Sequence, residues 1–281
     1  MAGARAAAGV LAQARSLLTW HLRSRRCGVC GEPTVSYDAG VKRACRACGT
    51  RVYPRTDCVA IAAVLHGNGP DQRLMVGRQG GWPEGMHSCL SGFIDAGETA
   101  EETVRREVGE ETGLEVGPVR LHATQPWPLQ RGTFGQLMVG AAAATPGTRF
   151  GSGSAEAAAG AAGALPEGVW KAPATPLAGP GREIESVLWL TREAAARAVL
   201  EGVAYGIGAP RPAAPRPETD PAAPAAAASP AATALAAARS FVPGPYAIAH
   251  FLIRDWIDGR GVFAGDHDGC GGGDSPGRSR L

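Results

Sequence analysis

One segment, residues 92–114 (GFIDAGETAEETVRREVGEETGL), constrains the fold of this 281-residue chain more than any other. Thr99 can cap the amino end of a helix, and Glu102 stands three residues later, which completes a capping box. Gly113 suits the left-handed backbone position that ends a helix. The segment therefore predicts a helix over residues 100–112.

Three carboxylates crowd one face of this expected helix. Glu107, Glu110 and Glu111 are separated by three and four residues and fall within an arc of about 100°. Such groups repel one another on a solvated surface helix unless a cation neutralises them. Hard divalent cations prefer oxygen ligands, and Mg²⁺ usually shares carboxylates with substrate phosphates. Arg106 can hold a neighbouring carboxylate in place, so this face predicts a divalent-cation site.

The whole segment resembles the Nudix box, G-x5-E-x7-R-E-U-x-E-E-x-G-U with U apolar, at every defined position. The matching residues are Gly92, Glu98, Arg106, Glu107, Val108, Glu110, Glu111, Gly113 and Leu114. The resemblance implies a Nudix hydrolase, which cleaves a nucleoside diphosphate linked to another moiety. It further implies an α/β fold, the α/β/α sandwich around a mixed sheet.

The same resemblance implies roles for the carboxylates. Glu107 and Glu111 would be ligands of Mg²⁺ or Mn²⁺, and Glu110 would lie in or beside their shell. Glu98 and Arg106 complete the expected catalytic set. Bound metal would lower the pKa of a water molecule and align it for attack on a phosphorus atom. The carboxylate that acts as the base differs within the family and is left open.

The remaining patterns agree with this fold. Apolar stretches of β type occur at 58–65, 73–78, 87–94, 119–125, 137–144 and 185–191, and further helices are expected at 193–200 and 245–258. Gly/Ala/Pro-rich composition at about 145–181 and 205–239 indicates low-complexity insertions. We expect an amino-terminal helix (1–26), a ribbon (27–54), a catalytic domain (55–258) and a flexible tail (259–281).

Four of the seven cysteines form two tight pairs, Cys27-x2-Cys30 and Cys45-x2-Cys48. Four thiolates at this spacing predict a closed tetrahedral Zn²⁺ site, which is structural because no coordination position stays open. Nearby cations, Lys42, Arg43, Arg46 and Arg51, leave RNA contact as a secondary idea. The cysteines Cys58, Cys89 and Cys270 have no partner pattern, and the first two are expected in strands of the core.

A zinc ribbon directly before a Nudix domain resembles the NADH pyrophosphatases, which also act on NAD-capped RNA 5′ ends. Trp20 and His21 match the helix that leads into that family's ribbon. Residues 124–128 (TQPWP) match the start of the motif S-Q-P-W-P-F-P-x-S, and 243–256 match the closing helix. Leu129 replaces the phenylalanine of the motif, and extra residues follow it. ADP-ribose or a CoA derivative therefore remains an alternative substrate.

By this resemblance, Glu183 is the third acidic metal ligand and Ser91 offers a backbone carbonyl to metal. Substrate would be bound by Tyr53 and Phe93, which stack on a ring, and by Gln125, Pro126, Trp127, Pro128 and Ala249. The resemblance also implies a homodimer, with Tyr53 serving the partner's site. The expected products are nicotinamide mononucleotide (reduced or oxidised) and AMP.

Charge and the chain ends bear on partners and location. The net charge of +2 excludes a strongly basic nucleic-acid binder as a description of the whole chain, which weakens an NAD-cap or RNA-binding role. No apolar run approaches the roughly 18 residues of a membrane span. The terminal Ser279-Arg280-Leu281 resembles a peroxisomal address. Rival locations are the cytoplasm and, because residues 1–26 hold arginines and no acid, a mitochondrion or plastid.

Overall fold

A computed structural model describes residues 2–127, 134–150, 170–171, 183–206 and 241–264. They fall into two compact units. The ribbon unit holds the described parts of 1–59 and 124–138, and the sheet unit holds those of 60–123 and 139–270. No helix in the described part of the chain combines the length and the hydropathy needed to cross a bilayer.

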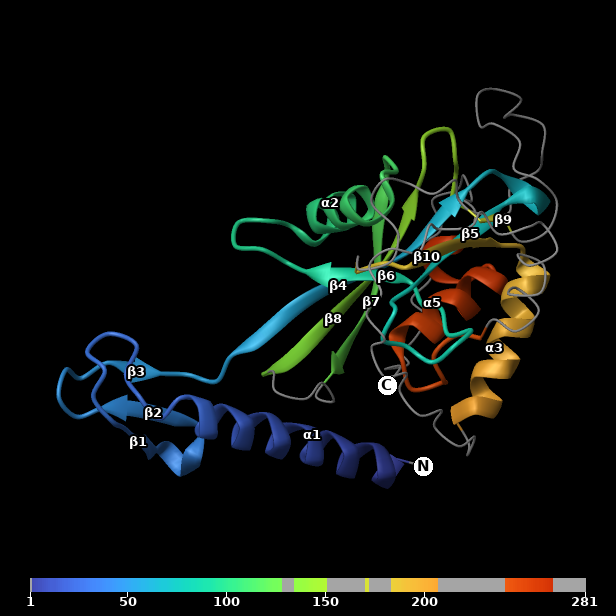
Figure 1. Ribbon diagram of the computed structural model, residues 1–281. Coiled ribbons are helices and arrows are strands. Elements are labelled where there is room, and N and C mark those ends of the chain that lie inside the picture. Colours follow the sequence, from blue (N-terminus) through green and yellow to red (C-terminus); the bar gives the residue numbers. More distant parts are fainter. Residues whose placement is uncertain (1, 128–133, 151–169, 172–182, 207–240, 265–281) are drawn as a thin grey trace, which may run out of the picture. The chain divides into compact units, whose positions relative to one another are not determined.

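The ribbon unit joins a helix to a small sheet. Helix α1 (Ala2–Arg23) precedes the antiparallel strands β1 (Thr34–Tyr37), β2 (Lys42–Cys45) and β3 (Arg51–Val52) (Figure 1). The end of α1 is fastened by His21, whose Nε2 donates to the Gly40 carbonyl at 2.7 Å. The Nδ1 atom of His21 accepts from Arg43 at 2.8 Å. The helix expected at the amino terminus is confirmed.

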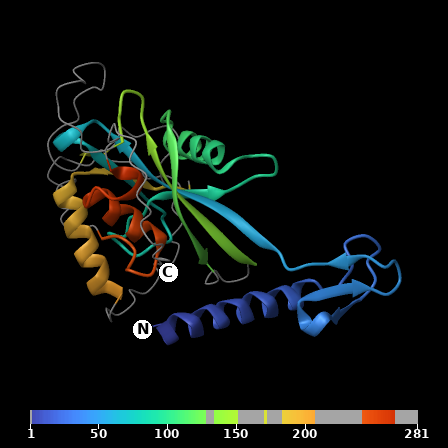
Figure 2. The same cartoon turned by 180° about the vertical axis from the view of Figure 1, so that it is seen from behind.

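The sheet unit is built on seven strands in the order β7-β8-β4-β5-β10-β9, with β6 paired to β4. Helix α2 lies on one side, and α3 and α5 lie on the other (Figures 1 and 2). This layering confirms the expected α/β/α sandwich. The strands are β4 (Thr56–His66), β5 (Arg73–Arg78), β6 (Leu90–Phe93), β7 (Val119–Trp127), β8 (Gly135–Ala144), β9 (Trp170–Lys171) and β10 (Ser186–Leu190); the helices are α2 (Ala100–Thr112), α3 (Arg192–Gly206) and α5 (Ile248–Ile257).

Strand β4 shows why the sheet lies in the middle. Ala62 and Val64 pack in one core cluster with Val104 and Val108 of α2. Side chains alternate across a sheet, so Ile61 and its alternate neighbours face the opposite layer, where they are also buried. Because both faces are covered, the strand has a continuous apolar sequence instead of an alternating one.

The expected capping of α2 is confirmed. Thr99 Oγ1 accepts from the Glu102 backbone N–H at 3.2 Å, and the Glu102 carboxylate accepts from the Thr99 N–H at 2.8 Å. Gly113 ends the helix with φ of 71°. The capping box and the buried valines of α2 fix the rotation of the helix, and this rotation sets where its glutamates lie.

Several elements differ from expectation at their ends. Helix α5 begins at Ile248 instead of residue 245, because a turn in which the Ala247 N–H donates to the Gly244 carbonyl precedes it. Strand β6 is shorter than expected, since Ser88 forms only an isolated bridge with Gly77. At the start of the first expected insertion, residues 145–150 form a turn that buries Phe150.

Some sequence expectations fall outside the described residues. These are Pro128, Cys270, the peroxisome-like terminus at 279–281, and most of the two low-complexity insertions. Of the two remaining unpaired cysteines, Cys58 lies in β4 and Cys89 is buried next to β6.

Candidate active site

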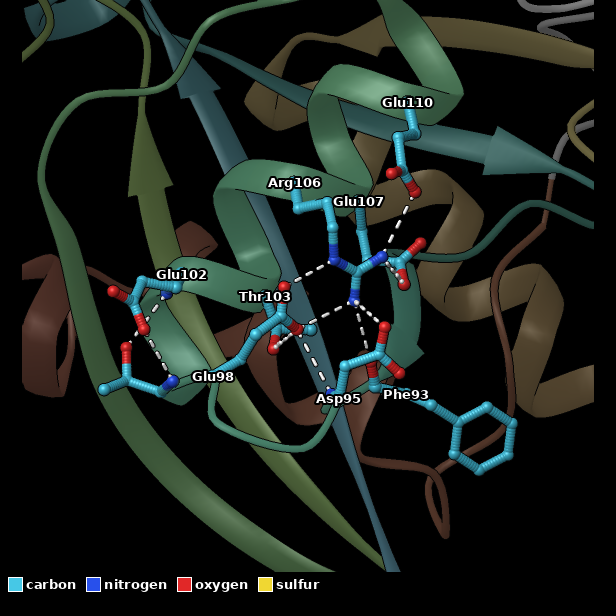
Figure 3. Close-up of polar contacts among 9 residues, drawn as sticks. Phe93, Asp95, Glu98, Glu102, Thr103, Arg106, Glu107 and Glu110 are labelled. Carbon is cyan, nitrogen blue, oxygen red and sulfur yellow. Dashed lines mark hydrogen bonds and ion pairs between the residues drawn. The ribbon is translucent and has the colours of Figure 1, made fainter.

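The guanidinium of Arg106 is the centre of the polar network on α2 (Figure 3). Its Nε and Nη2 atoms donate to the two carboxylate oxygens of Glu98 at 2.6 and 2.9 Å, a two-point contact. Thr103 Oγ1 and the Asp95 N–H also donate to Glu98, at 2.8 and 3.1 Å. The hydrogen bond from Arg106, followed by that from Thr103, lowers the pKa of Glu98 to about 2. Glu98 is therefore ionised and positions Arg106.

The other side of Arg106 holds Glu107, a candidate metal ligand, and Glu110, which is expected in or beside the metal's shell. Its Nη1 atom donates to Glu107 at 2.8 Å and to Glu110 at 3.1 Å. Figure 3 shows both carboxylates turned toward the guanidinium. Nη2 also donates to the backbone carbonyl of Phe93 at 3.0 Å, which ties α2 to the end of β6. The structure thus brings together Glu98, Arg106, Glu107 and Glu110 of the expected catalytic set.

Gly92 has a steric role at this site. A Cβ atom added to Gly92 would lie 1.9 Å from the carboxyl carbon of Glu107, far inside van der Waals contact. The side chain of Glu107 therefore lies directly against the backbone of β6. Any larger residue at position 92 would displace this carboxylate, which explains why a glycine fits here.

Glu111 is the buried carboxylate of the group. Its exposed fraction is 7%, and its Oε2 atom has no hydrogen-bond partner among the residues that the structure describes. Burial raises the pKa of Glu111 to about 8, and the negative charges of Glu107, Glu183 and Glu110 add to this effect. Burial also raises the pKa of Glu107, although Arg106 acts in the opposite direction. A buried carboxylate without a partner is costly, so this position favours a cation as its missing partner.

The donors at this position suit a hard divalent cation, because they are carboxylate oxygens. Glu183 lies just before β10, where Gln79 Nε2 donates to its Oε1 at 3.5 Å, and Ser91 lies in β6. Within the described residues, however, only the four cysteines place all their ligand atoms within 4.8 Å of one another. Arg106 holds the carboxylate of Glu107.

The expected substrate-binding residues are divided between the two units. Phe93, at the end of β6, has a 46% exposed ring that points away from Arg106 (Figure 3). Ala249 is buried in the first turn of α5, also in the sheet unit. Tyr53, 55% exposed, belongs to the ribbon unit. So do Gln125, Pro126 and Trp127, which form the end of β7.

Sequence reasoning missed two contacts of the site. Thr103 fixes Glu98, and Gln79 contacts Glu183. Thr103 follows Glu98 by five residues, a weak signal because Glu98 precedes the helix. Gln79 follows β5 and is far from the carboxylates in sequence, so no sequence pattern indicated its contact with Glu183.

The four paired cysteines meet in the ribbon unit. Their sulfur atoms are separated by 3.6 Å (Cys27 and Cys48), 3.5 Å (Cys30 and Cys45) and 3.4 Å (Cys30 and Cys48). Tetrahedral zinc with Zn–S bonds of about 2.3 Å needs sulfur atoms about 3.8 Å apart. The cluster therefore has the size of a zinc site with no open position.

Two matching turns build this cluster. The Gly31 N–H donates to the Cys27 carbonyl and the Gly49 N–H to the Cys45 carbonyl, both at 2.9 Å. The two glycines have φ of 77° and 75°, in the left-handed region that glycine adopts without strain. The Thr50 hydroxyl lowers the pKa of Cys48 to about 6.

Comparison with protein families identifies both parts of the chain. Residues 55–160 match the NUDIX domain, and residues 22–53 match the NADH pyrophosphatase zinc ribbon domain. The structural zinc site expected from the cysteine spacing is thereby confirmed as a zinc ribbon with a four-cysteine cluster.

Three curated relatives show the extent of the similarity. The chain is 36% identical to "Nudix hydrolase 19, chloroplastic" of Arabidopsis thaliana, over 89% of this chain and 51% of the relative. It is 33% identical to human "NAD-capped RNA hydrolase NUDT12", over 89% of this chain and 42% of the relative. It is 42% identical to human "NAD(P)H pyrophosphatase NUDT13, mitochondrial", over 45% and 35% respectively. The chain thus spans about half, or less, of the length of these relatives.

Proposed function

The chain belongs to the Nudix family, and we propose that it hydrolyses the pyrophosphate of NADH or NAD⁺ to nicotinamide mononucleotide and AMP. The observation that carries the proposal is the buried carboxylate of Glu111. Its Oε2 has no hydrogen-bond partner in the described part of the chain, and burial, followed by the charges of Glu107 and Glu183, raises its pKa. A divalent cation would supply the missing partner and, at the same time, bind a pyrophosphate.

Four groups of the sheet unit would hold this cation. They are the carboxylates of Glu107, Glu111 and Glu183 and the backbone carbonyl of Ser91. Bound Mg²⁺ or Mn²⁺ would neutralise pyrophosphate charge and lower the pKa of a water molecule. The chain itself keeps the carboxylates in place. Glu98 fixes the guanidinium of Arg106, and this guanidinium in turn holds the carboxylates of Glu107 and Glu110.

Recognition of the dinucleotide is proposed for exposed aromatic residues. The rings of Phe93 and Tyr53 are about half exposed, and the nicotinamide and adenine rings both offer flat faces for stacking. Residues 125–128 and Ala249 would contact the rest of the substrate. The name of a relative, "NAD(P)H pyrophosphatase", supports a nicotinamide dinucleotide over ADP-ribose or a CoA derivative.

The proposal is tested with a substrate panel. Purified protein is incubated with NADH, NAD⁺, ADP-ribose or a CoA derivative, with Mg²⁺ or Mn²⁺, and products are resolved by chromatography. We expect AMP and nicotinamide mononucleotide from the nicotinamide dinucleotides, at rates above those for the other substrates. Cleavage of ADP-ribose or CoA alone would keep the Nudix chemistry and reject the proposed substrate.

Removal of NAD caps from RNA is a second candidate function, and the name of the human relative, "NAD-capped RNA hydrolase NUDT12", supports it. The bond cleaved is the same, but the AMP half would remain attached to RNA. Salt distinguishes the two substrates, because contacts with an RNA chain weaken steeply as salt rises. Cleavage of free dinucleotide should change little over the same range.

Three further expectations remain proposals. A homodimer, with Tyr53 reaching the partner's site, is tested by sedimentation and by mixing two inactive variants that complement each other. A peroxisomal location is tested by imaging the full chain with and without residues 279–281. The domain limits at 27–54 and 55–258 are tested by limited proteolysis.

A further inference from the structure

Glu183 differs from the other expected metal ligands because it lies on neither α2 nor β6. It precedes β10, which begins at Ser186, so strand pairing does not by itself fix its carboxylate. Burial is the main cause of the raised pKa of Glu111 and of Glu107, and the charge of Glu183 adds to both. The carboxylate of Glu183 therefore lies within electrostatic reach of these two glutamates, and other contacts must keep it there.

Arg78, the last residue of β5, fixes the chain just after Glu183. Arg78 lies opposite Ser186 in the register of the two strands, and its carbonyl accepts from the Glu185 N–H at 2.8 Å. The Nε atom of Arg78 donates to the Glu185 carboxylate at 3.1 Å. Between these points and Glu183, the side chain of Ile184 is buried in the core cluster. The two residues after Glu183 are thus held by the core and by Arg78.

The same guanidinium shapes the loop that follows β5. Nη1 of Arg78 donates to the Pro83 carbonyl, and Nη2 donates to the Trp82 carbonyl at 3.1 Å. The Trp82 N–H in turn donates to the Gln79 carbonyl at 3.0 Å, which closes a turn. From the start of this turn, Gln79 Nε2 donates to Glu183 Oε1 at 3.5 Å. Arg78 therefore acts on both sides of Glu183.

The donors of Arg78 are already engaged. Each of its three guanidinium nitrogens has a partner in the loop or in the segment before β10, and its side chain is only 15% exposed. A positioning role therefore fits Arg78 better than direct contact with a substrate phosphate. Lysine could not replace it, because one ammonium group cannot donate in the fixed directions of a planar guanidinium.

We propose that Arg78 is a positioning residue for the catalytic cation, because it holds Glu183 toward the glutamates of α2 through Glu185 and Gln79. This inference rests on the proposed function, since it takes Glu183 as a ligand of that cation. Groups that orient a metal ligand typically change metal affinity about 10–100-fold when they are lost. Loss of the Arg78 contacts should therefore weaken the binding of the metal itself, before any substrate is present.

The test measures Mn²⁺ binding by electron paramagnetic resonance and NADH cleavage on the same samples. Arg78→Lys keeps the positive charge and loses the three-point contact, so a change in charge cannot explain its effect. The matched control, Arg192→Lys, alters another partly buried guanidinium of the sheet unit, which donates to carbonyls at the end of α5. Glu183→Gln and the double variant of Arg78→Lys with Glu183→Gln complete a cycle. Circular dichroism and urea unfolding establish that each variant is folded under the assay conditions.

We expect Arg78→Lys to raise the dissociation constant of Mn²⁺ about tenfold, while Arg192→Lys leaves it at the wild-type value. In the presence of Glu183→Gln, the Arg78 substitution should have little further effect, because no carboxylate remains to be positioned. Saturating Mn²⁺ should restore most of the kcat of Arg78→Lys, with an unchanged KM for NADH. A raised KM that excess Mn²⁺ does not correct would place Arg78 in substrate binding and overturn the inference.

A second variant guards against a folding defect in Arg78→Lys. Gln79→Ala removes one neutral amide from the loop and leaves every contact of the Arg78 guanidinium in place. We expect it to raise the dissociation constant of Mn²⁺ about threefold, the usual effect of one lost hydrogen bond. Wild-type Mn²⁺ affinity in Gln79→Ala would reject the part of the inference that acts through the loop.

The remaining outcomes separate this inference from the proposed function. Unchanged Mn²⁺ affinity in Arg78→Lys, an equal loss in Arg192→Lys, or an equal loss with and without the Glu183 carboxylate would overturn the inference alone. Wild-type affinity in Glu183→Gln would remove Glu183 from the ligand set and overturn the inference with it. If Mn²⁺ binding follows the expected pattern and NADH is not cleaved, the proposed substrate fails and the role of Arg78 stands.

Discussion

Replacement of Glu111 by Gln should stabilise the metal-free protein while it abolishes hydrolysis. Glu111 is 7% exposed, and its pKa of about 8 in the folded state stands far above its ordinary value of 4.5. Below pH 4.5, the carboxyl group is neutral in the folded and unfolded states. Between pH 4.5 and 8, the unfolded chain loses this proton and the folded chain keeps it, so stability must fall as pH rises.

The magnitude follows from the same linkage. Each pH unit in this window removes at most about 1.4 kcal/mol from the free energy of unfolding. The limit over the whole window is about 5 kcal/mol, and water that reaches the carboxylate reduces it. We expect the wild type to lose about 1–3 kcal/mol between pH 5 and 8 through this group. Glutamine cannot ionise, so the variant should lack this loss.

Urea unfolding provides the assay. The wild type, Glu111→Gln and the exposed control Glu115→Gln are compared from pH 5 to 8, in buffer free of Mg²⁺ and Mn²⁺ so that structural zinc is retained. The difference between the wild type and Glu111→Gln should grow with pH, while the control follows the wild type. Parallel curves for all three proteins would refute the reasoning that Glu111 is buried without a partner.

Gly92→Ala should lower kcat about 100-fold by displacing the Glu107 carboxylate, whereas Gly81→Ala, where an added Cβ meets nothing within 4 Å, should leave kcat unchanged. Arg106→Lys should lower kcat about 10–100-fold, because an ammonium group cannot make the two-point contact with Glu98; wild-type kcat would reject that role. Thr99→Ala should lower the free energy of unfolding by about 1 kcal/mol through loss of the cap, measured by urea unfolding. Cys45→Ser should lose zinc and the ribbon's circular dichroism signal, whereas Cys58→Ser should keep stoichiometric zinc by atomic absorption.

Local signals allowed much of the sheet unit to be predicted. The bounds of α2 follow from its capping box and from Gly113, and β5 and β4 follow from apolar runs that both faces of the sheet bury. The start of α5 was placed three residues too early, because the turn at Gly244 leaves no pattern in a Pro/Gly-rich approach. The pattern of apolar residues predicts which positions are buried, but it does not predict where a helix begins.

The candidate site was predictable to a different extent. The spacing of the glutamates predicts one shared face, but not which of them is buried. Glu111 is buried because it follows the apolar side of α2, whereas Glu110 turns to solvent and Arg106. The restraint of Glu107 by Arg106 and the close approach of Gly92 depend on how β6 packs on α2, which no local pattern contains.

The most direct test of the central claim measures Mn²⁺ binding. Electron paramagnetic resonance of free Mn²⁺ gives the dissociation constant for the wild type, Glu111→Gln and Glu115→Gln, with AMP release from NADH followed on the same samples. The account predicts that Glu111→Gln weakens Mn²⁺ binding at least tenfold and abolishes AMP release, while Glu115→Gln changes neither. Equal Mn²⁺ affinity in all three proteins would contradict the assignment of the metal site to the glutamates of α2.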